Sequence, residues 1–262
     1  MNQTLFEIFP SVSALCEDIH SNSAKLWEKR HERNSWSGQQ TIGEAQALAA
    51  GGCLATAARL SPLVERALSL VDIPVRARAR VRDVAGGCPD VPAYLMGEPE
   101  HFNALRVVES EATPVRVFVP LVCSASIAAR TIEQRGAVIA AFCIALGTIR
   151  PVELYGYTAG DGRKNACIKL ATAPFVASEV GYALTSPAFM RQVCYGWLDT
   201  RDWSGAWADW SGYGQRCPRA AIGAADDDLV LDYAFSEDGR IADADKWLRD
   251  TLAQFTAQDF AE

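Results

Sequence analysis

The stretch of residues 115–146 constrains the fold of this chain more than any other feature of the sequence. Residues 115–122 form a run of β-branched and other apolar residues, of the kind that fills the centre of a sheet. A polar turn at residues 123–126 separates this run from residues 127–146, where apolar positions recur at helical spacing. A buried strand, a polar turn and a long apolar helix in that order predict an α/β protein.

The elements that follow extend this α/β prediction. Residues 152–157 and 166–171 have the composition of strands, and the short connection between them contains no helix, so we expect an antiparallel hairpin. We expect helices at residues 177–198 and 242–255, with a strand at residues 229–234 between them.

The first 112 residues have a different character. Residues 1–35 read as one or two helices, and a capping box at Thr41 and Glu44 predicts the start of another. Further short helices are expected at residues 53–58 and 62–71. The sequence therefore predicts a mostly helical region with a small β element at residues 1–112, followed by an α/β domain at residues 113–262.

Composition excludes several classes of protein. The chain has 262 residues, of which 49% are hydrophobic and 22% charged, so it has enough apolar residues to build a core. The net charge of -7 argues against nonspecific coating of nucleic acid. The longest apolar run, residues 136–147, is too short to span a bilayer, and we expect no contact with a membrane. The N-terminal residues lack the basic start of a secretory signal.

Signatures of cofactor or enzyme chemistry are sparse. The eight cysteines include no C-x-x-C pair, which argues against a zinc site and favours a reducing, cytoplasmic setting. The three histidines lack metal-ligand spacing, and no nucleophile-elbow, P-loop or dinucleotide motif is present. We therefore expect no cofactor and no catalytic residues. A group of four carboxylates could be a charged turn or an Mg²⁺ site: Asp226, Asp227, Asp228 and Asp232.

The turn after the first predicted sheet strand carries Ser124 and Ser126. Together with the hairpin expected after the long helix, it resembles the von Willebrand factor A-like fold over residues 113–262, which implies a three-layer α/β domain. That fold has an Asp-x-Ser-x-Ser metal motif at this place, and the two serines match it. Val122 stands at the position of the aspartate, so the resemblance implies a degenerate site and no bound metal. The alternative is that the serines cap the following helix.

Several stretches spread over the chain resemble a family of uncharacterised tailed-phage and prophage proteins. They are residues 40–52, 90–99, 135–136 and 186–192. This resemblance implies a viral setting and, for the protein, the cytoplasm of the host cell. It implies no activity and no catalytic residues.

An alternation of apolar and arginine residues marks residues 75–82 as a strand with one charged face. The arginines Arg76, Arg78, Arg80 and Arg82 would project about 7 Å apart, close to the phosphate spacing of a single nucleic-acid strand. They form either a solvated or salt-bridged face or a nucleic-acid contact.

The last candidate site is aromatic. Trp203, Trp207 and Trp210, with Tyr213, lie close together in a segment that also carries aspartates. Rigid rings offer contact area at low entropic cost, so the segment is either a protein-interaction surface or a loop packed on the core. The leading hypothesis is a non-enzymatic protein-interaction module of unknown partner, encoded by a phage or prophage. The alternatives are a nucleic-acid-associated phage protein that uses the arginine strand and, more weakly, a metal-dependent enzyme.

Overall fold

The chain divides into two compact units in the computed structural model. Unit 1 comprises Met1–Val71 and Pro114–Glu262, and unit 2 comprises Asp72–Thr113. The residues that the structure describes are 5–26, 28–71, 78–85, 88–107, 114–124, 126–160, 164–201, 219–231 and 241–256.

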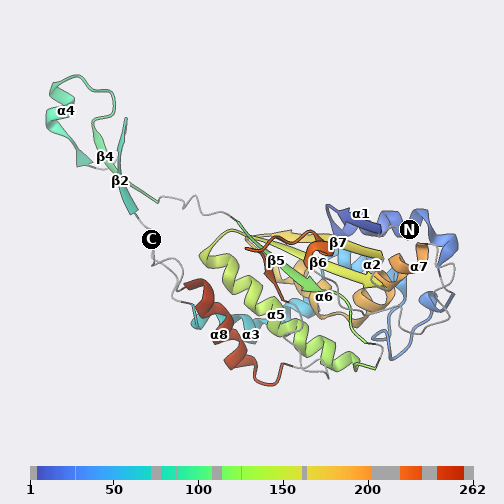
Figure 1. Cartoon of the computed structure of the whole chain (residues 1–262). Coiled ribbons are helices and arrows are strands. Elements are labelled where there is room, and N and C mark those ends of the chain that lie inside the picture. The colour runs from blue at the N-terminus through green and yellow to red at the C-terminus, as the bar shows by residue number, and fades with distance from the viewer. Residues whose placement is uncertain are drawn as a thin grey trace. The chain divides into compact units, whose positions relative to one another are not determined.

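Unit 1 is built on a five-stranded, mostly parallel sheet, which confirms the α/β class (Figure 1). The strands in spatial order are β1 (Leu5–Phe9), β7 (Lys164–Thr172), β6 (Val152–Gly160), β5 (Val115–Pro120) and β8 (Leu229–Val230). β5 pairs in parallel with β6 and with β8, and β1 pairs in parallel with β7. β6 and β7 form the predicted antiparallel hairpin.

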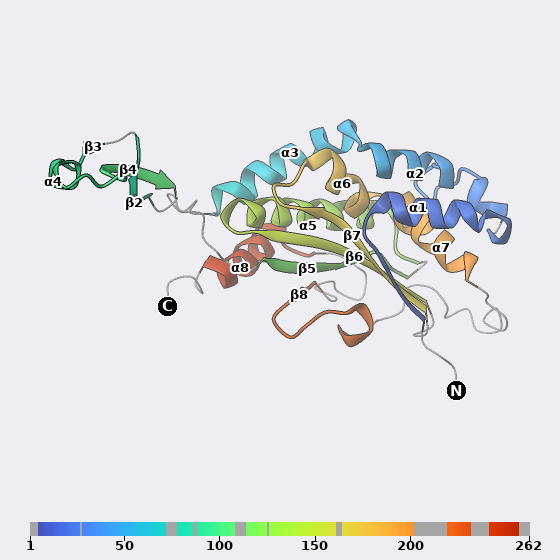
Figure 2. The same ribbon diagram turned by 90° about the horizontal axis from the view of Figure 1, so that it is seen from above.

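Seven α-helices and several shorter helical turns are described in unit 1. The α-helices are α1 (Val12–Ser21), α2 (Ile42–Gly51), α3 (Leu54–Ser69), α5 (Ala129–Ile149), α6 (Ala177–Thr185), α7 (Tyr195–Thr200) and α8 (Ala244–Thr256). The turns are η1 (Ser23–Lys25), η2 (Glu28–His31), the π-helix η3 (Phe189–Cys194) and η5 (Arg219–Ile222). Figure 2 shows α5 and α6 against one face of the sheet, with α2 and α3 outside them.

The main core lies between the sheet and these helices. Val117, Val119 and Leu154 point from the sheet toward the buried side chains of α5 and α6. A smaller core lies on the opposite face, where Phe118 and Tyr157 pack with Ile222 of η5. In the described part of unit 1, the short helical turn η5 covers that opposite face. A three-layer domain requires helices on both faces of the sheet, and this arrangement is not seen in the described residues.

The first 71 residues belong to the same unit as the sheet, which differs from the predicted division at residues 112 and 113. Residues 5–9 were expected to be helical, but they form the edge strand β1. Their sequence, Leu-Phe-Glu-Ile-Phe, becomes a strand because β7 supplies backbone partners from a distant part of the chain. The predicted boundary near Pro114 does mark the end of unit 2.

Local sequence signals fix several helix ends. Thr41 and Glu44 form the predicted capping box at the start of α2, which ends before Gly52 at a φ of 78°.

The break expected between residues 58 and 62 is absent from the described helix α3, which runs through Pro62. Proline removes a single backbone donor, and contacts of α3 with α5 and α6 outweigh that loss.

Helix α5 is longer than the apolar run at residues 136–147 that it contains. By length and composition it is able to cross a membrane, but 61% of its most apolar window is buried inside the protein. It serves as the central helix of unit 1, and at Gly136 its backbone lies directly against α6: a Cβ there would stand 2.0 Å from the carbonyl oxygen of Leu184.

The described part of unit 2 is a small antiparallel sheet with one short helix. Its strands, in the order β2-β4-β3, are β2 (Arg78–Asp83), β4 (Phe102–Val107) and β3 (Cys88–Pro89), and its helix is α4 (Val91–Leu95). β2 confirms that the apolar–arginine alternation forms a strand.

Candidate functional site

The segment of residues 121–128 connects the carboxyl end of β5 to α5. After β5 the chain continues to β6 on one side of β5, and it later returns to form β8 on the other side of β5. Such a reversal of direction in a parallel sheet is where α/β proteins bind ligands, just outside the carboxyl ends of the strands. This loop is therefore the first candidate site in unit 1.

Ser124 and Ser126 are exposed on this loop. Their hydroxyl oxygens lie 2.9 Å apart, and the backbone N–H of Ser126 donates to Ser124 Oγ at 3.4 Å. Helix α5 begins only at Ala129, with Ala128 as its N-cap and no side-chain cap. The alternative reading of the serines as helix caps is therefore wrong.

The oxygen atoms of the loop do not make a divalent-cation site of the expected kind. Val122, at the position of the motif's aspartate, is apolar and 3% exposed. The three motif positions therefore supply two neutral hydroxyl groups and no carboxylate. Within the described ranges, no three His, Cys, Asp or Glu side chains come together as metal ligands would. The residues present do not fit the metal that the fold resemblance implies.

Arg191, on the π-helix η3, lies directly beneath the loop. Its side chain is 1% exposed, and its guanidinium donates to the carbonyl oxygens of Ser124 at 3.4 Å and of Ile127. It also donates to the carbonyl of Trp36 at 2.6 Å and lies 4.7 Å from the centre of the Trp36 ring. An internal cation thus holds the carbonyl groups of the loop, each such charge-assisted bond contributing about 1.5–3 kcal/mol.

Tyr195 holds the start of the loop. Its hydroxyl donates to the carbonyl of Cys123 and accepts from the N–H of the same residue at 3.1 Å. Burial raises the pKa of the Tyr195 phenol, so the hydroxyl keeps the proton that it donates. The loop backbone is fixed from below at both ends, and its serine hydroxyls face outward.

A buried ion pair fixes the support for Arg191. Arg30 pairs with Asp199 at 2.7 Å, with side-chain exposures of 3% and 6%, and it donates to the carbonyl of Arg191. The side-chain amide of Gln192 donates to the carbonyls of Glu32 and Gln40 at 3.3 and 3.1 Å. The N-terminal segment and η3 therefore form one polar network behind the loop.

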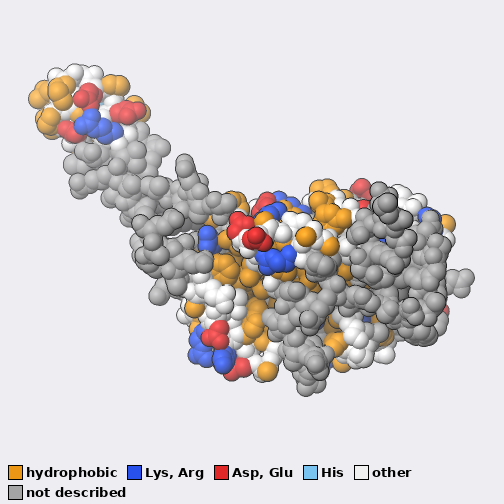
Figure 3. Space-filling model, viewed as in Figure 1, with side chains coloured by type: hydrophobic (Ala, Val, Ile, Leu, Met, Phe, Trp, Pro, Cys, Tyr) orange, Lys and Arg blue, Asp and Glu red, His pale blue; other side chains and the backbone are white. Residues whose placement is uncertain are grey.

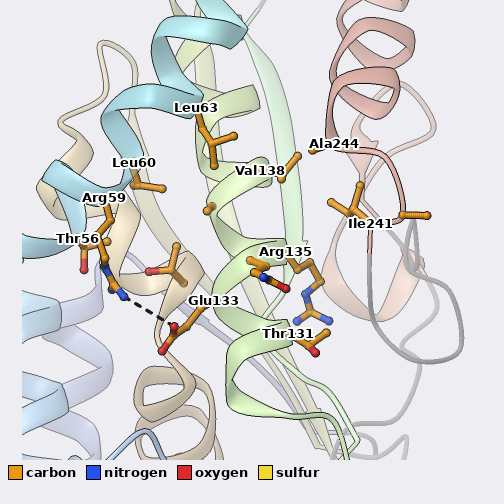
Figure 4. A pocket seen from close by; sticks show the side chains of 14 residues that line it. Thr56, Arg59, Leu60, Leu63, Thr131, Glu133, Arg135, Val138, Ile241 and Ala244 are labelled. Carbon is orange, nitrogen blue, oxygen red and sulfur yellow. Dashed lines mark ion pairs between the residues drawn. The ribbon is translucent and has the colours of Figure 1, made fainter.

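Unit 1 contains a pocket of about 480 Å³ between α3, α5 and residues 241–244 (Figure 4). Leu60, Leu63, Val138 and Ile241 form apolar walls. At the α3 side, Arg59 and Glu133 pair at 3.7 Å. Glu133 is the acid among the described lining residues, and it is committed to this pair.

Helix α4 of unit 2 exposes its large apolar side chains to solvent. Val91, Tyr94 and Leu95 share one side of the helix and are 57%, 63% and 78% exposed, whereas Ala93 is the buried residue. Met96, directly after the helix, is 69% exposed. Orange side chains accordingly gather on this unit in the space-filling view (Figure 3). We call these four exposed side chains the α4 face.

The structure describes the predicted site residues unevenly. Arg82 pairs with Glu98 and, at 3.5 Å, with Asp90. At this position the structure therefore has the salt bridge that was one of the two predicted roles of the arginines. Arg78 and Arg80 lie in β2 at the edge of the small sheet. Outside the described residues lie Arg76, Trp203, Trp207, Trp210 and Tyr213.

Within the acidic group near β8, Asp226 and Asp227 are exposed, and Asp228 is engaged in structure. Asp228, 9% exposed, accepts two hydrogen bonds from Arg116 at 2.8 and 2.6 Å, and one from the N–H of Ala225 at 2.6 Å. Its oxygens hold a turn together. Asp232 lies outside the described residues.

Sequence reasoning missed two features. Arg191 had a signal, since it is a lone charge in an apolar stretch between Met190 and Val193. The α4 face also had one, because Tyr94, Leu95 and Met96 form an apolar cluster in a segment otherwise rich in turn formers. Neither signal reveals by itself whether the side chain is buried or exposed.

Comparisons with known proteins give one match. No curated protein and no solved structure matches the chain. The profile of a family described as a domain of unknown function (DUF7192) matches residues 2–259, and the chain belongs to that family.

Proposed function

We propose that this protein is a non-enzymatic protein-interaction module whose contact surface is the α4 face. One observation carries the proposal: a short helix turns its apolar side to solvent and buries only Ala93. Exposing adjacent large apolar side chains is costly in water, and such patches mark partner sites on folded proteins. The α4 face is contiguous along the chain, unlike the isolated exposed Leu54 of α3.

Within this proposal, unit 1 is a von Willebrand A-like module with a degenerate metal position. The order β7-β6-β5-β8, with β7 as the antiparallel member of a hairpin, supports this reading. Arg191 and Tyr195 support it too, because they fix the loop from inside and make a cation unnecessary for its shape. The phage or prophage origin and the host cytoplasm belong to the same proposal and depend on the sequence likeness. So does a second contact surface in the segment of Trp203, Trp207, Trp210 and Tyr213.

A second candidate function is contact with nucleic acid. The observation that favours it is the position of β2 at the edge of its sheet, with Arg78, Arg80 and Arg82 at alternate positions of the strand. Against it, the Arg82 charge is already balanced by Glu98 and Asp90.

Site-specific photo-cross-linking tests the interaction function. A photo-reactive residue replaces Leu95 in the full chain, and a matched variant carries it at Leu54, which is 82% exposed on α3. We expect a discrete protein adduct in cells of the native source from position 95 and none from position 54. Excess unlabelled wild-type chain should compete it away, and excess Leu95→Glu chain should not.

The proposal fails if position 95 gives no adduct, or if positions 54 and 95 give the same adducts. Equal competition by the wild-type chain and by Leu95→Glu would also overturn it, because the adduct would then not depend on the α4 face.

A further inference from the structure

We propose that the pocket between α3, α5 and residues 241–244 binds a small molecule with one carboxylate group and an apolar body. The pocket lies within unit 1, so this inference goes beyond the proposed interaction function and does not depend on it. Its volume of about 480 Å³ falls in the range of cavities that enclose small molecules in proteins.

The pocket is polar toward one end and apolar toward the other. Along α5 its lining runs from Thr131 through Arg135 to Val138, and along α3 it runs from Thr56 to Leu63. Figure 4 shows Thr131 and Arg135 toward one end, with Leu63 and Val138 toward the other. This arrangement matches a molecule whose charged head and apolar body lie at opposite ends.

The polar end is formed by Arg135 and Thr131. They lie four residues apart on α5 and hence on one side of the helix, and their exposures are 4% and 6%. The Thr131 hydroxyl makes no hydrogen bond within the described part of the chain. Arg135 donates to the thioether sulfur of Met190 at 3.8 Å. Since a guanidinium has five N–H donors and a carboxylate takes two of them, Arg135 can hold a ligand beside its other contacts.

The charge of the lining favours a head group with a single negative charge. Within the described lining, Arg59 and Glu133 balance each other at 3.7 Å, which leaves the charge of Arg135 as the net charge. Asp243, next to the lining in the chain, accepts a hydrogen bond from the N–H of Lys246 at 2.9 Å. One carboxylate would complement Arg135, whereas a phosphate group with two negative charges would bring an unbalanced charge into the pocket.

A series of head groups on one apolar chain tests the inference with the full wild-type protein. The probes are decanoate, decan-1-ol and decylammonium, each below the concentration at which it forms micelles, and calorimetric titration measures their affinities. We expect decanoate to bind about tenfold more tightly than decan-1-ol or better, and decylammonium to bind no better than the alcohol.

The length of the probe tests the apolar end of the pocket. From hexanoate to decanoate, each added CH₂ group should tighten binding about threefold to fourfold, because Leu60, Leu63, Val138 and Ile241 remove it from water.

Two variants assign the binding to this pocket. Arg135→Met should abolish the preference for decanoate over decan-1-ol, a result that a merely structural role of Arg135 would not give. Ala137→Phe fills the space beside α5 and should weaken decanoate binding about tenfold or more. Ala58→Phe is the matched control: Ala58 is exposed on α3 outside the described lining, and its replacement should change affinity by less than about twofold.

Absence of decanoate binding by the wild-type chain would overturn the inference, as would equal affinities for the three head groups. Binding that Ala137→Phe leaves unchanged would also overturn it, because the ligand would then lie outside this pocket. If Arg135→Met does not fold, the series of head groups on the wild-type chain still decides the outcome. Cross-linking at position 95 tests unit 2, so failure here leaves the interaction function standing.

Discussion

Arg191 is the residue that most clearly joins the structure of unit 1 to its candidate site. Its buried guanidinium is the group that the carbonyls of Ser124 and Ile127 face, and it also donates to the carbonyl of Trp36. A buried charge is tolerated when it is hydrogen-bonded, and the carbonyl oxygens that accept from it need a donor in the same way.

Removing this guanidinium should therefore be costly. We expect Arg191→Met to lower the free energy of unfolding by about 3 kcal/mol or more, because the partly buried carbonyls of Trp36, Ser124 and Ile127 together lose a charged donor. Arg59→Met is the control: that side chain is 63% exposed in a surface pair, and its loss should cost less than about 1 kcal/mol. Urea unfolding measures both, and equal costs would contradict the role of Arg191.

The serine pair gives the second prediction at this scale. Since Val122 supplies no carboxylate, millimolar Mg²⁺ or Ca²⁺ should leave the melting temperature unchanged. A cation at roughly 1,000 times its dissociation constant would add about 4 kcal/mol of stability, so binding would be plain in a melt. A rise of several degrees that Ser124→Ala abolishes would show that the loop holds a metal.

At the scale of elements, the contact of α5 with α6 depends on the absence of a side chain at Gly136. A methyl group there would meet the backbone of Leu184 at 2.0 Å and of Thr185 at 2.7 Å. Gly136→Ala should destabilise the protein by about 2 kcal/mol or more, because two helices must separate. Gly43→Ala in α2 has no atom within 4 Å of the new Cβ and should be neutral or slightly stabilising. Destabilisation by Gly43→Ala to the same degree would contradict this reading.

Strand β2 provides the test between salt-bridged face and nucleic-acid contact. If Arg78 and Arg80 bind phosphate, replacing both by glutamine should lower the affinity for all oligonucleotides alike and flatten its salt dependence. The ion pairs of Arg82 lead us to expect no binding by the wild type at about 150 mM salt. Measurable oligonucleotide binding at that salt, lost in the double variant, would establish the alternative function.

At the scale of the whole molecule, the chain is one unit interrupted by another. The described core clusters draw on residues up to Val71 and from Val115 onward, and on none in Asp72–Thr113. Replacing residues 72–113 by a flexible linker of about 15 Gly and Ser residues should leave the melting temperature of unit 1 within a few degrees. The shortened chain should also give no α4-dependent adduct. Failure of the shortened chain to fold would show that unit 1 depends on unit 2.

Signals that are local in the chain were readable from the sequence. The capping box at Thr41 and Glu44, the strand character of residues 78–82 and the short connection that makes the β6–β7 hairpin each depend on neighbours a few residues apart. The order of elements from residue 115 onward followed from the same periodicities and gave the α/β class.

Only the tertiary structure decided the features that depend on distant partners. Residues 5–9 became a strand because β7 pairs with them, and α3 continued through Pro62 because α5 and α6 pack on it. Arg191 faces the loop after β5, and the α4 face is open to solvent, because burial is a property of the packed chain. Short-range periodicity fixes which side of an element is apolar. It does not fix what that side meets, since loop closure and long-range packing bring the partner into place.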